Sequence, residues 1–160
     1  MEKSERKKGI AGLTNLFKDS VEDIPNGSKV AFAGSIGSCP PIAEMLAFAV
    51  RKREFELSYV PLANSSEARS MKWTEGLGFT MSAEKAQLRQ ADVLVVLGGL
   101  AMPKIGCPIE DVEALIDELG DIRLIGVGFM DILNRNGWTD KLSFDILIDG
   151  YVDAGILSKD

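Results

Sequence analysis

Two segments of the chain combine glycine, cysteine and proline in the same order. Residues 34–41 read GSIGSCPP, and residues 98–108 read GGLAMPKIGCP. Each segment follows an apolar run and ends in a Cys-Pro pair, which is typical of a helix start because proline suits the first helical turn. A cysteine there faces unpaired amides and the positive end of the helix dipole, which favour the thiolate. Cys39 and Cys107 are therefore candidate catalytic or redox thiols, although small buried cysteines are also common in protein cores.

The glycines of both segments also permit a binding site for a small anion. A backbone without Cβ atoms can approach a phosphate or carboxylate closely, and two serine hydroxyls add donors. Lys104 is the sole cation of the second segment and complements such a ligand. Neither G-x-G-x-x-G nor G-x-x-x-x-G-K-[ST] occurs, so the cofactor stays unknown. The candidate ligand-binding residues are Gly34, Ser35, Gly37, Ser38, Cys39, Gly98, Gly99, Lys104 and Cys107.

The composition excludes several kinds of site. The 160 residues contain no histidine, which removes Ser-His-Asp triads, a histidine general base and histidine-ligated zinc. The 18 Lys and Arg against 24 Asp and Glu give a net charge of −6, which duplex nucleic acid would repel. Asp131 and Asp149 each follow an apolar run, but helix caps and turns account for such carboxylates, and we assign no metal.

Alternating strands and helices must position these segments. Short apolar runs predict five buried strands, at 29–34, 55–60, 92–98, 122–129 and 144–148. Helical periodicity predicts helices at about 9–21, 42–53, 65–73, 82–90 and 108–119. The alternation predicts an α/β fold: one three-layer domain with a mostly parallel five-stranded sheet of the Rossmann or flavodoxin type.

Five strands favour the spatial order second, first, third, fourth, fifth. In that order the first and third strands are neighbours and send their connections to opposite faces, and ligands bind beyond the carboxyl ends at such a switch point. The segments 34–41 and 98–108 follow these two strands, so we expect a pocket between them. Cys39 and Cys107 would then come from neighbouring loops and could approach each other.

The ends of the chain suggest a cytoplasmic protein. Residues 1–8 are predicted to form a flexible basic tail before the helix at 9–21, and no apolar stretch follows that would suit a signal peptide. No run of 18 apolar residues occurs, so we expect no membrane partner. Two cysteines are too few for the disulfide lattice of a small secreted domain.

The motifs VAFAGSIGSCPP, at 30–41, and VVLGGLAMPKIGC, at 95–107, lie about sixty residues apart. With them, nearly the whole chain resembles a family of uncharacterised archaeal proteins, chiefly from methanogens and their relatives. The resemblance implies a compact Rossmann-like α/β domain of unknown function in an archaeal cytoplasm. The family carries no established activity, so no residue role follows from it.

Three functions compete on these observations. The first is a binding or sensory domain that holds a small anionic metabolite or nucleotide between the two segments. The second is a cysteine-dependent enzyme or redox protein that uses Cys39 or Cys107. The third is a structural or interaction protein that forms a homodimer through its N-terminal helix. We rank ligand binding first, because an open α/β sheet with irregular glycine loops usually has a crevice there, which is an argument by analogy.

Overall fold

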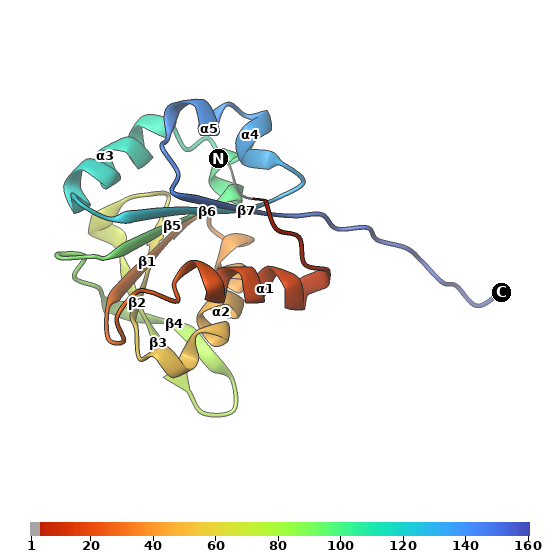
Figure 1. Ribbon diagram of the computed structural model, residues 1–160, viewed down its shortest axis with the longest axis horizontal. Helices are drawn as coiled ribbons and strands as arrows, with labels where there is room; N and C mark the ends of the chain where they lie inside the picture. Colours follow the sequence, from red (N-terminus) through yellow and green to blue (C-terminus); the bar gives the residue numbers. More distant parts are fainter. Residues whose placement is uncertain (1–3) are drawn as a thin grey trace.

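The computed structural model describes residues 4–160 and contains one mixed sheet of seven strands (Figure 1). Five strands are parallel, in the spatial order β2 (Glu56–Pro61), β1 (Lys29–Gly34), β5 (Val93–Leu97), β6 (Arg123–Phe129) and β7 (Ile146–Gly150). This is the expected order of the five predicted strands. A hairpin of β3 (Arg69–Thr74) and β4 (Gly78–Lys85) adds two antiparallel strands beyond β2. The predicted five-stranded, mostly parallel sheet is therefore wrong, and the sheet is mixed.

Helices cover both faces of the sheet (Figure 1). One face carries α1 (Gly9–Ser20) and α2 (Cys39–Ala49), and the other carries α3 (Ile109–Leu119), α4 (Ile132–Arg135) and α5 (Trp138–Lys141). Short 3₁₀ turns follow three elements: η1 (Arg51–Arg53), η2 (Ser65–Glu67) and η3 (Gly98–Ala101). Within residues 4–160, no helix combines the length and the apolar character that crossing a membrane requires. Residues 1–3 of the predicted basic tail lie outside the described residues.

The hairpin occupies a region where helices were predicted, at 65–73 and 82–90. Met71 and Met81 lie opposite each other on β3 and β4, and both pack on the core under α2. On β4, Phe79 and Met81 lie two residues apart and both pack on the core, which is the spacing of a strand with one buried face. Residues 75–77 form the turn between the strands, and two glycines have positive φ: Gly76 in the turn and Gly78 at the start of β4. The glycines that the helical interpretation treated as a break are the turn of a hairpin.

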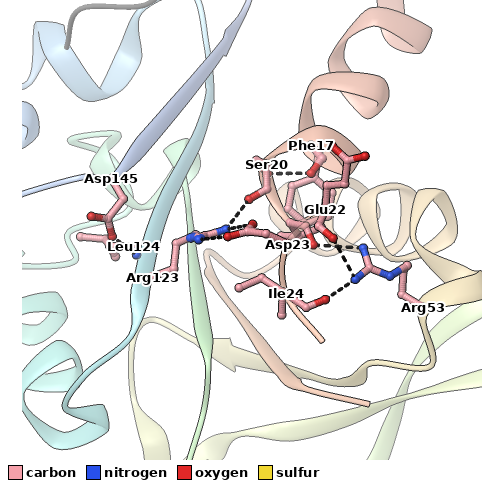
Figure 2. Close-up of polar contacts among 10 residues, drawn as sticks. Phe17, Ser20, Glu22, Asp23, Ile24, Arg53, Arg123, Leu124 and Asp145 are labelled. Atoms are coloured by element: carbon pink, nitrogen blue, oxygen red, sulfur yellow. Dashed lines mark hydrogen bonds and ion pairs between the residues drawn. The ribbon is translucent and has the colours of Figure 1, made fainter. Parts of the chain in front are cut away.

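Two arginines fasten the loop between α1 and β1 (Figure 2). Arg123, at the start of β6, donates to both carboxylate oxygens of Asp23, at 2.5 and 2.6 Å, and to the carbonyl of Ser20 at 3.0 Å. Arg53 donates to the carbonyl of Ile24. Hydrogen bonding to Arg123 holds the pKa of Asp23 at about 2. These contacts fix the C-terminal end of α1 and the loop after it at the amino ends of the parallel strands, opposite the edge where the glycine segments lie.

Candidate functional site

The segments after β1 and β5 meet at the carboxyl edge of the sheet. β1 continues through residues 35–38 into α2 on one face, and β5 continues through η3 into α3 on the other face. The switch point lies where the strand order placed it. A Cβ added to Gly99 would overlap the Sγ of Cys39 and would lie 3.1 Å from the Oγ of Ser35. Because residue 99 is glycine, η3 packs directly on the start of α2.

A buried polar cluster lies beneath this contact. The Oγ of Ser35 donates to the Sγ of Cys39 at 3.0 Å and lies 3.1 Å from the Oγ of Ser38. The hydroxyl of Tyr59 donates to the carbonyl of Ser35. Burial raises the pKa of Tyr59 above its usual range, and the neighbouring Cys39 adds to that effect. A Cβ on Gly34 would overlap both the Tyr59 hydroxyl and the Cys39 side chain, so glycine is needed there too.

The loop above this cluster presents backbone donors to solvent. Ile36, Gly37 and Ser38 are exposed, and no carbonyl of the described backbone accepts from their N–H groups. The φ angle changes from +93° at Gly37 to −84° at Ser38. A change of sign between successive φ angles is the backbone pattern in which neighbouring N–H groups can turn towards one side, as they do in anion-binding loops. The next helix offers less, because Pro40 and Pro41 in the first turn of α2 lack an N–H.

The two cysteines lie on opposite faces of the sheet. Cys39 is the first residue of α2 and belongs to the core under α1 and α2. Cys107 precedes Pro108, the N-cap of α3, and packs against the core of the other face, with its Sγ 3.8 Å from the carbonyl of Leu62. Both thiols are free, and the fold does not bring them together. Burial raises the pKa of Cys107, and the charge of Asp111 raises it further, which is opposite to the expected thiolate.

The second segment also lines a hollow at the surface. Lys104 is exposed and makes no ion pair among residues 4–160. A wide, open hollow of about 350 Å³ adjoins this segment, and its lining includes Met102, Cys107, Asn136 and Trp138. Neither Asn136 nor Trp138 was predicted from the sequence as a site residue. The available signal was a lone tryptophan in an otherwise polar stretch after the fourth predicted strand.

Glycines of η3 and β6 allow α4 to pack closely at this edge. A Cβ on Gly98 would overlap Ile132 of α4 and would lie 2.9 Å from the Cα of Gly128. A Cβ on Gly126 would lie 3.0 Å from the Cδ1 of Leu133. Ile132 of the helix therefore packs directly on the glycine backbone at Gly98 of η3 and Gly128 of β6.

The backbone is strained at two further places on the carboxyl edge. Leu62 and Ala63 after β2, and Met130 and Asp131 after β6, all have φ between 53° and 61°. Non-glycine residues adopt this conformation at a cost, and they cluster at functional sites. Asp149 accepts from the Asp131 N–H at 3.0 Å through both carboxylate oxygens, and burial raises its pKa. No group of three Cys, Asp or Glu side chains in the described part of the chain is arranged to hold a metal ion.

Most of the chain matches a known protein family. A family model described as an uncharacterized protein conserved in archaea (DUF2124) matches residues 8–153. The chain belongs to this family. The resemblance carried by the two motifs is therefore confirmed.

Relatives of the family come from methanogens. An uncharacterized protein of Methanocaldococcus jannaschii is 34% identical over 152 residues, covering 95% of this chain and 91% of the relative. An uncharacterized protein of Methanothermobacter thermautotrophicus is 35% identical over 159 residues, covering 98% and 99%. The crystal structure of a protein of unknown function from Methanothermobacter thermautotrophicus matches with a TM-score of 0.88 at 35% identity, covering 99% of each chain.

Proposed function

We propose that this protein binds a small anion, a phosphate- or carboxylate-bearing molecule, at the switch point between β1 and β5. Residues 34–41 and 98–108 form the two walls of the site. The observation that carries the proposal is the exposed loop Ile36–Ser38, whose N–H groups have no acceptor among residues 4–160 and lie beside the facing segment at Gly99. Unpaired amides in a concave loop are the donors that phosphate and carboxylate groups prefer.

The charges of the two segments support an anion rather than a cation. The protein carries a net charge of −6, yet residues 34–41 contain no charged side chain and residues 98–108 contain only Lys104. The Ser38 hydroxyl adds a donor beside the loop amides. Because two prolines remove N–H groups from the start of α2, the donors come from the loop, and the site does not depend on the first helical turn.

Thermal unfolding with a ligand panel tests the proposal. The panel contains inorganic phosphate, sulfate, mono- and dinucleotides, coenzymes and small carboxylates. A ligand at one hundred times its Kd stabilises the native state by about 2.7 kcal/mol, which raises the Tm of a domain of this size by roughly 5–11 °C. If no anion in the panel raises the Tm, the proposal fails.

A matched pair of glycine variants locates the site. Gly37 and Gly76 have φ of +93° and +82°, and a Cβ on either would meet nothing within 4 Å. Gly37→Ala and Gly76→Ala therefore introduce similar backbone strain, one in the proposed site and one in the β3–β4 turn. We expect both variants to lower the Tm, whereas only Gly37→Ala, and separately Lys104→Gln, weakens the response to the anion. Equal ligand responses in all three variants would contradict the assignment.

A cysteine-dependent reaction stays a prediction with weaker support. Cys39 is 4% exposed, and its Sγ already accepts a hydrogen bond from Ser35. The raised pKa of Cys107 lowers its thiolate fraction at neutral pH. Both properties disfavour nucleophilic attack on a substrate.

A further inference from the structure

Residues 151–160, called the C-terminal arm below, hold apolar side chains in solvent. β7 is an edge strand, and the arm continues past Gly150 and runs away from the helices (Figure 1). The base of the arm is held, because the guanidinium of Arg6 lies 5.9 Å from the centre of the Tyr151 ring. All ten residues are exposed, with Ile156 at 90% and Leu157 fully exposed. Two adjacent large aliphatic side chains on an extended arm gain free energy from any apolar surface that covers them.

An apolar surface of matching character lies at the other end of the sheet. We call Phe48, Trp73 and Leu77 the aromatic patch; they come from α2, from β3 and from the turn before β4. All three are exposed, and Trp73 is 47% exposed. The rings of Phe48 and Trp73 stack with centroids 6.1 Å apart and an interplanar angle of 14°. The guanidinium of Arg51 covers the Phe48 ring at 4.1 Å. Stacking fixes the Phe48 and Trp73 rings relative to each other, and contiguous exposed apolar surface often marks an interaction site.

The arm is too short to cover the aromatic patch of its own chain. Five strand spacings separate β7 from β3, which is about 24 Å at roughly 4.8 Å each. Gly150 lies at the carboxyl edge of the parallel strands. On β3, which runs antiparallel to β2, Ser70 pairs with Ser58, so Trp73 lies three residues further towards the amino edge of the parallel strands. This offset of about eight residues adds roughly 26 Å along the strands, so the two points are about 35 Å apart. Seven residues, from Gly150 to Leu157, span at most about 25 Å.

We propose that the arm of one copy packs on the aromatic patch of a second copy, and that two copies exchange arms about a two-fold axis. In such an isologous pair each copy supplies one arm and one patch, so both exposed surfaces are covered at once. Ile156 and Leu157 then lie on Trp73 and its neighbours.

Charge supports the same partner. Beside the patch, α2 is followed by Arg51 and Lys52, both exposed, while the arm carries Asp153 and Asp160 against a single lysine. Glu75 accepts from the indole N–H of Trp73 and also borders the patch, so the basic border lies on the α2 side, and that side faces an arm of net negative charge. Opposite charges across an interface steer association and favour the correct partner.

Light scattering and sedimentation of the full chain test the exchange. We expect a dimer for the wild-type chain and a monomer for the double variant Ile156→Ser/Leu157→Ser, with the dissociation constant raised at least about 100-fold. The substituted side chains are solvent-exposed in the monomer, so circular dichroism should remain unchanged. Ile10→Ser is the matched control: Ile10 is also an exposed aliphatic residue, but it lies on α1, outside both proposed surfaces.

Acrylamide quenching of tryptophan fluorescence provides a second readout. Trp138 is buried, so a change in quenching with protein concentration reports on Trp73. Dimerisation should protect Trp73 in the wild-type chain and not in the double variant. A wild-type chain that stays monomeric at about 100 µM overturns the proposal, as does a dimer that survives the double substitution. Loss of the dimer in Ile10→Ser assigns the interface to α1 and also overturns it.

Discussion

Substitution of Gly99 by alanine tests the contact between the two glycine segments. The new methyl group would overlap the Sγ of Cys39 and lie 3.1 Å from the Oγ of Ser35, and both of these residues are buried. Gly99 does not have a positive φ, so the backbone accepts alanine and the cost is steric. Overpacking costs about 1–3 kcal/mol, and the smaller entropy of the unfolded chain offsets about 0.4–1 kcal/mol. We expect a net loss of about 1–2 kcal/mol, or roughly 2–8 °C in Tm.

Cys39→Ala completes a double-mutant cycle. This substitution removes the atom that the new methyl group meets, and it also removes the acceptor of the Ser35 hydroxyl. Alone it should cost about 1–2 kcal/mol, from the small cavity and the lost hydrogen bond. In the double variant the Gly99→Ala methyl group occupies the vacated space. We expect the double variant to be more stable than the sum of the single effects by at least about 1 kcal/mol.

Urea unfolding followed by far-UV circular dichroism gives the four free energies. The control cycle pairs Cys39→Ala with Gly106→Ala, because a Cβ on Gly106 meets nothing within 4 Å. That cycle should be additive within about 0.5 kcal/mol, as for independent sites. Additivity in the Gly99 cycle as well would refute direct packing of η3 on α2, and the proposed site would lose its second wall.

Three other outcomes follow from individual contacts. A thiol reagent should label Cys107 before Cys39, because Cys39 is almost completely buried, and equal native-state rates in single Cys→Ser variants would contradict this. The pKa of Asp23 is lowered to about 2, so its pairing with Arg123 stabilises the fold above its ordinary pKa of 3.8 and is lost as pH falls towards 2. Asp23→Asn should flatten acid unfolding in that range, and an unchanged profile would show that the pair adds nothing. The raised pKa of Tyr59 means that stability falls as pH rises above about 10, where the unfolded chain ionises, and Tyr59→Phe should remove that slope while costing about 1–2 kcal/mol at neutral pH.

The carboxyl edge was predictable because strong local signals fixed it. After a charged first residue, Lys29 or Asp92, the runs at 29–34 and 92–98 are apolar, end in glycine and lie in the middle of the sheet, where both faces are buried. Composition marks such strands clearly, and five parallel strands favour the flavodoxin-like order, which is one of the common orders of open α/β sheets. The meeting of Gly99 with Ser35 and Cys39 follows from that order.

The hairpin at 69–85 was not predictable by the same means. Only Met71 is buried on β3, and the rest of its side chains are partly or fully exposed, so the two-residue alternation is weak at this outer edge. A strand of this kind is selected by pairing with β2 and β4, which a local pattern does not contain.

The separation of the two thiols has a topological cause. The crossover that brings the segments together also sends α2 and α3 to opposite faces of the sheet. Each cysteine stands at the start of its helix and therefore follows that helix, so Cys39 and Cys107 diverge. The two Cys-Pro pairs predicted that each cysteine lies near the start of a helix. The face of the sheet on which that helix packs depends on the whole fold.

The seating of α4 on bare glycine backbone has a mechanical consequence. Because Gly98 and Gly128 lie directly beneath Ile132, no side chain stands between them and α4 that could change rotamer when α4 shifts. The helix can therefore move only as a rigid body together with the turn at Met130 and Asp131. The α4 side of the carboxyl edge is therefore rigid. Any conformational change that accompanies ligand binding should occur in the exposed loop Ile36–Ser38, which is held by few hydrogen bonds. We expect α4 to keep almost the same position in the complex.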